Sequence, residues 1–462
     1  MRRWLAALLP VVLIGATTLL TGVHAEAAPA AKRRVAKKTA KRKAPARRRP
    51  PPVSAQARAK ASEEVEAVLT RSAEAYIENP AALVPFFEML YRQKNGESSE
   101  PLRVLHYGDS HTAADEWTGA VRIALQSEFG DGGGGYSFAG KPFRSYRRLD
   151  LRGGATLGWR SVGLLRKDGD GLYGLGGISV ATTLARQSIF LDAECSRLEL
   201  FYLQQPGGGA VELFENGAAV ARFSTDGPLG PGYFEHVTQP GAHHFELRTV
   251  ERKPVRLFGW VSEKDTGVTY ETLGINGAQA SLMLRWDEEL FANNVARRNP
   301  ALIVLAYGTN EAGNPDWTQE SYRDMFAELL ARLRRAAPAA SILVLGPPDR
   351  TRLIRGRWTP DARLDRIVAA QREAALASGC AYWDLREIMG GAGAMHNWFL
   401  AGLAQYDHVH FNKPGYQRLG SVLFRDLMYN YERYSTARNQ LIGLVTTDGQ
   451  PDADQPDHSE DR

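Results

Sequence analysis

The sequence contains little cysteine and lacks the common metal-binding motifs. Only two of its 462 residues are cysteines, Cys195 and Cys380, and both lie among apolar residues. We expect two buried thiols, because nothing in the sequence supports a disulfide between them. No cysteine-rich pattern and no His-Glu-x-x-His motif is present, which argues against a zinc-hydrolase framework.

Long apolar runs are scarce apart from one at the N-terminus. Arg2 and Arg3 precede an apolar run from Trp4 to about Leu20, and small residues around Ala25 follow it. This pattern predicts that residues 1–27 form a secretory signal peptide; the alternative is an uncleaved anchor, since the run is nearly long enough to span a bilayer. No cysteine follows the run, which argues against a lipoprotein. Both alternatives predict export to the periplasm or cell envelope.

The positive charge is confined to the first part of the chain. The formal net charge is +5, but residues 1–60 hold 15 Lys and Arg against one acid, so the remainder carries about −9. Eleven of the basic residues lie in residues 31–50. We predict a disordered basic linker over residues 28–61 and a disordered acidic tail over residues 441–462. Behind an export signal we expect no nucleic-acid partner; attachment to an anionic envelope or membrane surface and a merely solvated linker remain alternatives.

Two patterns of hydrophobicity divide the remaining chain. In the first, short continuous apolar strands alternate with amphipathic helices, which predicts a parallel sheet covered on both faces, a three-layer α/β/α fold. The expected strands are 104–109, 301–308, 341–347 and 381–385, and the expected helices are 117–129, 281–298, 319–336, 361–378 and 414–431. Ligands bind such sheets at the carboxyl ends of the strands, where Asp109-Ser110 and Thr309-Asn310 are expected.

The second pattern covers residues 146–268, where apolar and polar residues alternate. Asn216-Gly217 lies between two such runs and is a strong hairpin signal. We predict an inserted antiparallel β-sandwich (jelly-roll) that divides the α/β domain into residues 62–145 and 269–440. The glycine-rich stretch 130–135 is interpreted as a flexible loop near the site, not a phosphate cradle, because no Lys-Ser/Thr pair follows it.

Two short motifs suggest nucleophilic catalysis. Ser110, in Gly108-Asp109-Ser110, follows a predicted strand and is either a nucleophile or a helix cap. Asp407 and His410 are three residues apart, a spacing that can place a carboxylate beside an imidazole base. The alternatives are surface histidines, or a metal site formed by Asp407, His408 and His410 with His106 or His111.

An acyl-transfer site also needs hydrogen-bond donors for the developing oxyanion. Asn310 follows the apolar strand 301–308 and can offer its side-chain amide at the same edge of the sheet. Gly277, just after the insertion, lets a backbone N–H approach a ligand closely, although an ordinary turn glycine is the alternative.

These motifs occur in the order of the four sequence blocks of SGNH (GDSL) hydrolases, which the chain resembles over roughly residues 100–430 apart from the insertion. The resemblance implies a serine hydrolase without metal or cofactor. Ser110 would be the nucleophile, His410 the base and Asp407 the residue that orients it. The oxyanion hole would be formed by the backbone N–H groups of Ser110 and Gly277 and the side chain of Asn310.

The stretches GDSHTAADEWTGAVR, FGDGGGGY, GINGAQAS, GTNEA and MGGAGAMHNW resemble bacterial peptidoglycan O-acetylesterases. Those enzymes are also similar to this chain in carrying a β-sandwich, like a family 35 carbohydrate-binding module, between blocks one and two. The resemblance implies an exported esterase that acts on O-acetylated peptidoglycan or a related polysaccharide. A polysaccharide O-acetyltransferase, an acetylxylan-type esterase and a non-catalytic glycan-binding envelope protein remain alternatives.

Overall fold

The computed structural model describes residues 53–71, 76–166 and 168–447. The predicted signal peptide or anchor, residues 1–27, lies outside this part of the chain. The predicted linker and acidic tail overlap it: helix α1 (Ala55–Leu69) begins inside the expected linker, and helix α11 (Lys413–Thr447) extends seven residues past the expected end of the domain at residue 440. Within the described part of the chain, no helix is long and apolar enough to cross a membrane.

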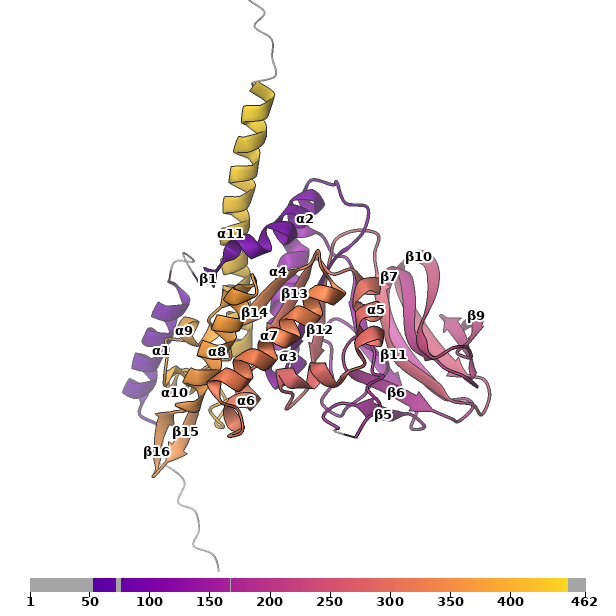
Figure 1. Cartoon of the computed structure of the whole chain (residues 1–462), viewed down its shortest axis with the longest axis horizontal. Helices are drawn as coiled ribbons and strands as arrows, with labels where there is room; N and C mark the ends of the chain where they lie inside the picture. Colours follow the sequence, from indigo (N-terminus) through magenta and orange to yellow (C-terminus); the bar gives the residue numbers. More distant parts are fainter. Residues whose placement is uncertain (1–52, 72–75, 167, 448–462) are drawn as a thin grey trace, which may run out of the picture. The chain divides into compact units, whose positions relative to one another are not determined.

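A six-stranded sheet forms the centre of the α/β part (Figure 1). Its order is β1-β17-β14-β13-β2-β12, and all neighbours are parallel except β1 with β17. The strands are β1 (Ile77–Glu78), β2 (Leu102–Gly108), β12 (Val268–Gly274), β13 (Leu302–Ala306), β14 (Ser341–Leu345) and β17 (Ala381–Trp383). Strands β13 and β14 are almost entirely apolar, as expected for a sheet covered on both faces. Strands β2 and β12 are also buried throughout, although they contain polar side chains such as Arg103, His106 and Glu271.

Successive residues of each strand enter different cores. In β2, Leu102 and Val104 pack on one face, whereas Leu105 and Tyr107 pack on the other. The first face is covered by α1, α2 (Val84–Lys94), α4 (Glu116–Phe129), α9 (Leu385–Ile388), α10 (Ala394–Leu400) and α11. The second is covered by the 3₁₀ helix η2 (Ala280–Arg285), α5 (Glu288–Arg298), α6 (Thr309–Gly313), α7 (Gln319–Ala336) and α8 (Arg363–Ala377).

This arrangement confirms the predicted α/β class and three-layer order. One expected helix, 281–298, is divided into η2 and α5. The division falls at Asp287, whose side chain accepts a hydrogen bond from Leu290 N at 2.8 Å and so caps α5. The remaining short elements are η1 (Pro80–Leu83), α3 (Ser110–Ala113) and the hairpin β15 (Thr351–Ile354) with β16 (Arg357–Pro360).

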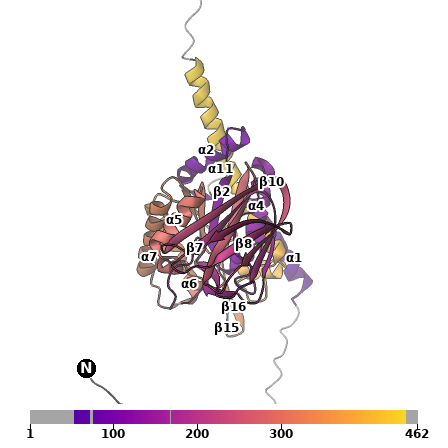
Figure 2. The ribbon, with the colours of Figure 1, turned by 90° about the vertical axis from the view of Figure 1, so that its right-hand side faces the viewer.

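The inserted part is antiparallel, as predicted, and its nine strands are hydrogen-bonded into one network (Figure 2). Two long strands, β7 (Ser188–Gln204) and β10 (Gly230–Thr249), pair along most of their length. The others are β3 (Gly135–Phe138), β4 (Arg152–Ala155), β5 (Arg160–Gly163), β6 (Ile178–Thr182), β8 (Ala210–Glu215), β9 (Ala218–Ser224) and β11 (Val255–Glu263). Asn216 and Gly217 join β8 to β9 with positive φ angles of 51° and 87°, which confirms the hairpin prediction.

The antiparallel sheet is joined to the α/β part by a buried ion cluster. Glu263, at the end of β11, is fully buried and accepts hydrogen bonds from Arg103 of β2 at 2.8 Å and from Arg298 of α5 at 2.7 Å. Arg298 also contacts Glu271 of β12, and Arg197 of β7 contacts Glu263. Because each buried charge has an opposite partner, the cluster fixes the sheet against the edge of the α/β domain.

The glycine-rich stretch 130–135 differs from its prediction as a flexible loop near the site. Gly132 and Gly133 pack directly on the chain that joins β11 to β12; a Cβ on Gly133 would lie 2.8 Å from Ser262 O. Asp131 bridges to Val268, which pairs with Leu102 at the start of β2, whereas Ser110 follows the end of that strand. The glycines therefore permit close backbone packing at the end of the sheet opposite the site.

Removing Glu263 tests the buried cluster. We expect Glu263→Ala to lower the free energy of unfolding by about 3–5 kcal/mol, because it leaves buried guanidinium groups without their carboxylate. Glu212→Ala, which breaks the exposed contact with Arg222 at 3.9 Å, should cost less than about 1 kcal/mol. Chemical denaturation of both variants gives the comparison, and equal small losses would contradict a structural role for the cluster.

Candidate active site

Three neighbouring strands end at the place where the predicted site residues lie. Gly108, the last residue of β2, pairs with Gly274 of β12 on one side and with Ala306 of β13 on the other. The segments that follow these strands carry Ser110, Gly277 and Asn310, respectively. Since parallel strands share a carboxyl edge, the sheet order brings three distant parts of the sequence together.

Ser110 stands on a tight turn after β2. A Cβ on Gly108 would lie 2.1 Å from Thr112 Oγ1 and 2.8 Å from Ala306 O, so only glycine fits there. Asp109 caps the following turn by accepting a hydrogen bond from His111 N at 2.9 Å. The helix that starts at Ser110 is α3, which has four residues, and the longer α4 begins only at Glu116.

The structure brings Ser110, His410 and Asp407 into one hydrogen-bonded chain. Ser110 Oγ lies 2.8 Å from His410 Nε2, and His410 Nδ1 lies 2.7 Å from Asp407 Oδ2. An ionised carboxylate can only accept, so Nδ1 carries the proton and Nε2 is left to accept from the serine hydroxyl. Asp407 Oδ1 also accepts from Val409 N at 2.9 Å and His410 N at 3.0 Å, which fixes the turn that carries both residues.

The pair Asp407–His410 is polarised. The hydrogen bond to Asp407 raises the pKa of His410 above its ordinary 6.5, although burial opposes this. Burial also opposes ionisation of Asp407, but hydrogen bonds from the His410 side chain and from backbone N–H groups hold its pKa well below the usual range. The carboxylate therefore stays charged while the imidazole gains basicity.

Asn310 and Gly277 face the same space as Ser110. Asn310 Nδ2 donates to Ala278 O at 2.9 Å and, more weakly, to Asp109 Oδ2 at 3.4 Å. Gly277 is exposed, has a φ of 78°, and donates its N–H to no acceptor within the described residues. Both residues therefore lie where the sequence prediction placed them.

Glu311 holds the two donor loops together, a role that the sequence did not reveal. Its carboxylate accepts from Ala280 N at 2.7 Å and from Gly308 N at 3.0 Å, so one buried side chain binds the loops after β12 and β13. Burial raises the pKa of Glu311 to about 7. In the sequence, the only signal for Glu311 is its position directly after Asn310.

A second histidine, His111, lies beside the ring of His410. His111 lies with its ring 5.1 Å from that of His410, and its Nδ1 is 2.9 Å from Tyr416 Oη on α11. Burial and the charge of His410 lower the pKa of His111 to about 3, so it remains neutral beside the base.

The alternative metal set does not converge. His106 Nδ1 contacts Tyr270 Oη at 2.8 Å, and His408 Nδ1 contacts Thr351 Oγ1 at 2.7 Å. His408 also stacks on Trp358, with ring centroids 3.5 Å apart, and so attaches the Asp407–His410 turn to the hairpin β15–β16. Within the described chain, no group of three or more His, Cys, Asp or Glu side chains could hold a metal ion.

An open groove of about 840 Å³ lies over Ser110. The α/β part supplies Ser110, Gly277, Asn310 and His410 to its lining. The segment between β3 and β4 also lines the groove, with Lys141 and residues 144–147, so the antiparallel part contributes to its wall. This arrangement leaves the serine accessible to a large substrate and to water.

Comparison with known proteins identifies a family domain in part of the chain. Residues 240–418 match the GDSL-like Lipase/Acylhydrolase family. The chain carries a GDSL-like acylhydrolase domain. The matched part includes Gly277, Asn310, Asp407 and His410, whereas Ser110 lies before it. The protein is a carboxylic ester hydrolase.

Solved structures similar to this acylhydrolase include a peptidoglycan O-acetylesterase, with a TM-score of 0.68 and 28% identity over 78% of this chain and 100% of that one. Weaker similarities are to family two carbohydrate esterases. The one from Clostridium thermocellum has a TM-score of 0.28 and 11% identity, covering 54% of this chain and 94% of that one. The one from Cellvibrio japonicus has a TM-score of 0.26 and 12% identity, covering 61% and 98%. No curated protein sequence matches the chain.

Replacing Asp407 tests the polarised pair. In Asp407→Asn the hydrogen-bonded negative charge is lost, so we expect the pKa of His410 to fall below its wild-type value. Titration of the His410 ring by NMR measures the shift directly. Asp324→Asn removes an exposed carboxylate on α7 and serves as the matched control, in which the His410 pKa should not change. An unchanged pKa in Asp407→Asn would contradict the assigned pairing.

Proposed function

We propose that the protein is an exported serine esterase that removes O-acetyl groups from a cell-wall polysaccharide, and that its substrate is O-acetylated peptidoglycan. The proposed chemistry rests on the hydrogen-bonded residues Ser110, His410 and Asp407 at the floor of an open groove. Ser110 Oγ lies 2.8 Å from His410 Nε2, and His410 Nδ1 lies 2.7 Å from Asp407 Oδ2. The choice of peptidoglycan as the polysaccharide is supported by the similarity to a solved structure described as a peptidoglycan O-acetylesterase. The similarity covers 100% of that structure.

In the proposed first step, His410 Nε2 removes the proton of Ser110 as Oγ attacks the acetyl carbonyl carbon. Asp407 stabilises the imidazolium that forms. His410 then donates this proton to the departing sugar oxygen, which leaves an acetyl group on Ser110. In the second step His410 takes a proton from water as the water oxygen attacks the acetyl carbon. His410 then returns this proton to Ser110 Oγ as the ester bond breaks, which releases acetate and restores the free serine and the neutral histidine.

Three donors would hold the oxyanion of each tetrahedral intermediate. They are the backbone N–H groups of Ser110 and Gly277 and the side chain of Asn310, whose weak 3.4 Å hydrogen bond to Asp109 is the one exchanged for the oxyanion. One such donor contributes roughly 3 kcal/mol to lowering the barrier. Glu311 would keep the Gly277 and Asn310 loops at a constant separation.

The openness of the groove favours hydrolysis over acetyl transfer. Transfer to a second sugar requires that water be excluded from the acyl-enzyme. The side chains of Ser110 and His410 are only partly buried, and the groove above them is wide enough for solvent. Water is therefore the acceptor that we propose.

The proposed location follows from the N-terminal sequence. The charged, apolar and small-residue pattern of residues 1–27 predicts export, with either cleavage or retention as an anchor. The basic residues 31–50 would then hold the enzyme near anionic envelope polymers or the membrane surface. The inserted antiparallel part would serve as a carbohydrate-binding wall of the groove.

Acetate release tests the proposal. We expect the full-length protein to release acetate from O-acetylated peptidoglycan, and Ser110→Ala to lower kcat by roughly three orders of magnitude or more without altering the fold. Ser421→Ala, a serine on the exposed face of α11, is the matched control and should retain activity. Release should be insensitive to EDTA, since every step uses side chains of the chain itself.

Acetylated xylan is the parallel substrate. Serine-dependent release mainly from xylan would preserve the mechanism and reject peptidoglycan as the substrate. Acetate transfer that requires a sugar acceptor would replace hydrolysis with transfer. Near-normal turnover by Ser110→Ala would overturn the catalytic assignment.

A further inference from the structure

The groove over Ser110 is strongly cationic along part of its wall. Lys141, Arg144 and Arg147 line it from the segment between β3 and β4, and Lys413 lines it from the start of α11. Glu116 is the one acidic side chain among the described residues of the groove lining. Residues 61–447 contain 41 Lys and Arg against 45 Asp and Glu, a net charge of −4, so the positive charge of this cluster is opposite in sign to that of the surrounding domain.

Most of this positive charge is not neutralised by the protein. Arg147 is paired with Glu116 at 2.8 Å. The other three basic side chains are exposed, and no carboxylate of the described residues lies within ion-pair distance of them. A groove that presents several unpaired cations in one direction attracts and orients anionic ligands.

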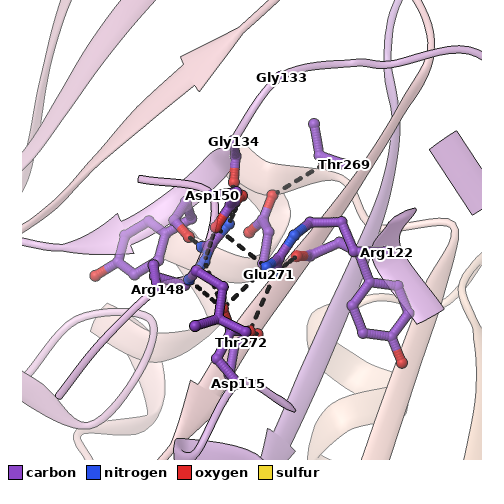
Figure 3. Close-up of polar contacts among 12 residues, drawn as sticks. Asp115, Arg122, Gly133, Gly134, Arg148, Asp150, Thr269, Glu271 and Thr272 are labelled. Carbon is purple, nitrogen blue, oxygen red and sulfur yellow. Dashed lines mark hydrogen bonds and ion pairs between the residues drawn. The ribbon is translucent and has the colours of Figure 1, made fainter. Parts of the chain in front are cut away.

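The segment that carries these cations is held rigidly beside the serine. Figure 3 shows Arg148, which is buried and donates to Gly134 O at 2.7 Å and to Asp150 at 2.7 Å. The next residue, Leu149, donates its N–H at 2.7 Å to the buried carboxylate of Asp115, which follows the Ser110 turn.

Two more contacts join this segment to its surroundings. Arg147 Nε donates to Ala114 O at 2.8 Å, and Tyr146 Oη accepts from Phe138 N at 3.1 Å. Asp115 is itself fixed by Arg122 of α4, at 2.9 Å. The backbone that carries Arg144 and Arg147 is therefore already held beside the Ser110 turn before a ligand binds.

We propose that this wall binds a carboxylate carried by the acylated sugar, so that the esterase selects acidic O-acetylated saccharide units over neutral ones. Lys141, Arg144 and Lys413 form the binding subsite. The inference rests on the proposed function for the ester that is cleaved, and it names the chemical class of the substrate. In peptidoglycan the carboxylate can come from the lactyl ether of muramic acid or from the stem peptide.

The experiment compares matched pairs of acetate esters on the full-length protein. One pair is O-acetylated N-acetylmuramic acid and its lactyl amide; a second is an O-acetylated muropeptide with free or amidated peptide carboxylates. A third pair, O-acetylated galacturonic acid and galactose, carries the same charge difference without any peptidoglycan component. The measured quantity is the ratio of kcat/KM for the charged and uncharged member of each pair.

We expect the wild-type ratio to be about tenfold in at least one pair at low ionic strength, and to decrease as salt is added. A preference in the first pair identifies the lactyl carboxylate as the bound group, whereas a preference in the second pair alone identifies a carboxylate of the stem peptide. In Lys141→Ala/Arg144→Ala/Lys413→Ala, the ratio should fall to near one. The charge-preserving variant Lys141→Arg/Arg144→Lys/Lys413→Arg should keep most of the preference.

The matched control removes the same charge from a distant surface of the inserted part, in Arg222→Ala/Arg252→Ala/Lys253→Ala. Its ratio should equal that of wild type. Equal rates for both members of every pair, or a preference that survives loss of the groove cations, would overturn the inference. Absence of acetate release from both peptidoglycan-derived pairs, with a charge preference in the galacturonate pair, would reject the proposed function and support the subsite.

Discussion

The site depends on the order of three neighbouring parallel strands, β13-β2-β12, at one edge of the six-stranded sheet. Their carboxyl ends meet at one edge, and each is followed by a residue that faces the same groove. Gly108 permits this convergence, because any side chain there would collide with Thr112 and with the backbone of β13. The fourth contribution, the Asp407–His410 turn, arrives from far along the chain and is held by contacts that are independent of the sheet.

Buried carboxylates hold the parts of this arrangement together. Glu263 fixes the antiparallel sheet to β2 and α5, Asp115 fixes the cationic segment to the turn after Ser110, and Glu311 fixes the two donor loops to each other. Each accepts several hydrogen bonds from buried donors, so its loss would leave those donors unpaired. The insertion is thus part of the site: its connection to the α/β domain also determines where the groove wall lies.

Much of the fold could be predicted because its signals are local. Continuous apolar strands, helical periodicity in 319–336, and the Asn216-Gly217 turn each depend on neighbouring residues, and the structure has these elements in place. Ser110 and Asn310 could be placed for a related reason, since each follows an apolar strand of one parallel sheet. Gly277 was indicated only by its place after the insertion and by the family resemblance, because the strand before it, β12, contains several polar residues. The Asp407–His410 pair follows from its own three-residue spacing.

The remaining features depend on contacts between distant residues. The sequence wrongly predicts a flexible loop near the site at the glycines of 130–135. Their packing partners lie more than a hundred residues away, at the β11–β12 connection, and no local pattern reveals them. The roles of His111, Glu311 and His408 depend on Tyr416, Ala280 and Thr351, respectively, and no local pattern points to them. The predicted ends of the folded part are wrong because charge and composition reveal neither helix α1 nor the extension of α11 from the predicted 414–431 to Thr447.

The central claim is that Ser110 is acylated during turnover. Rapid quenching of the full-length protein during hydrolysis of O-acetylated peptidoglycan, followed by peptide mass spectrometry, measures this directly. We predict an acetyl group on Ser110 that disappears when substrate is exhausted. Continued acetate release with no acetylated Ser110, under conditions that preserve serine esters, would contradict it.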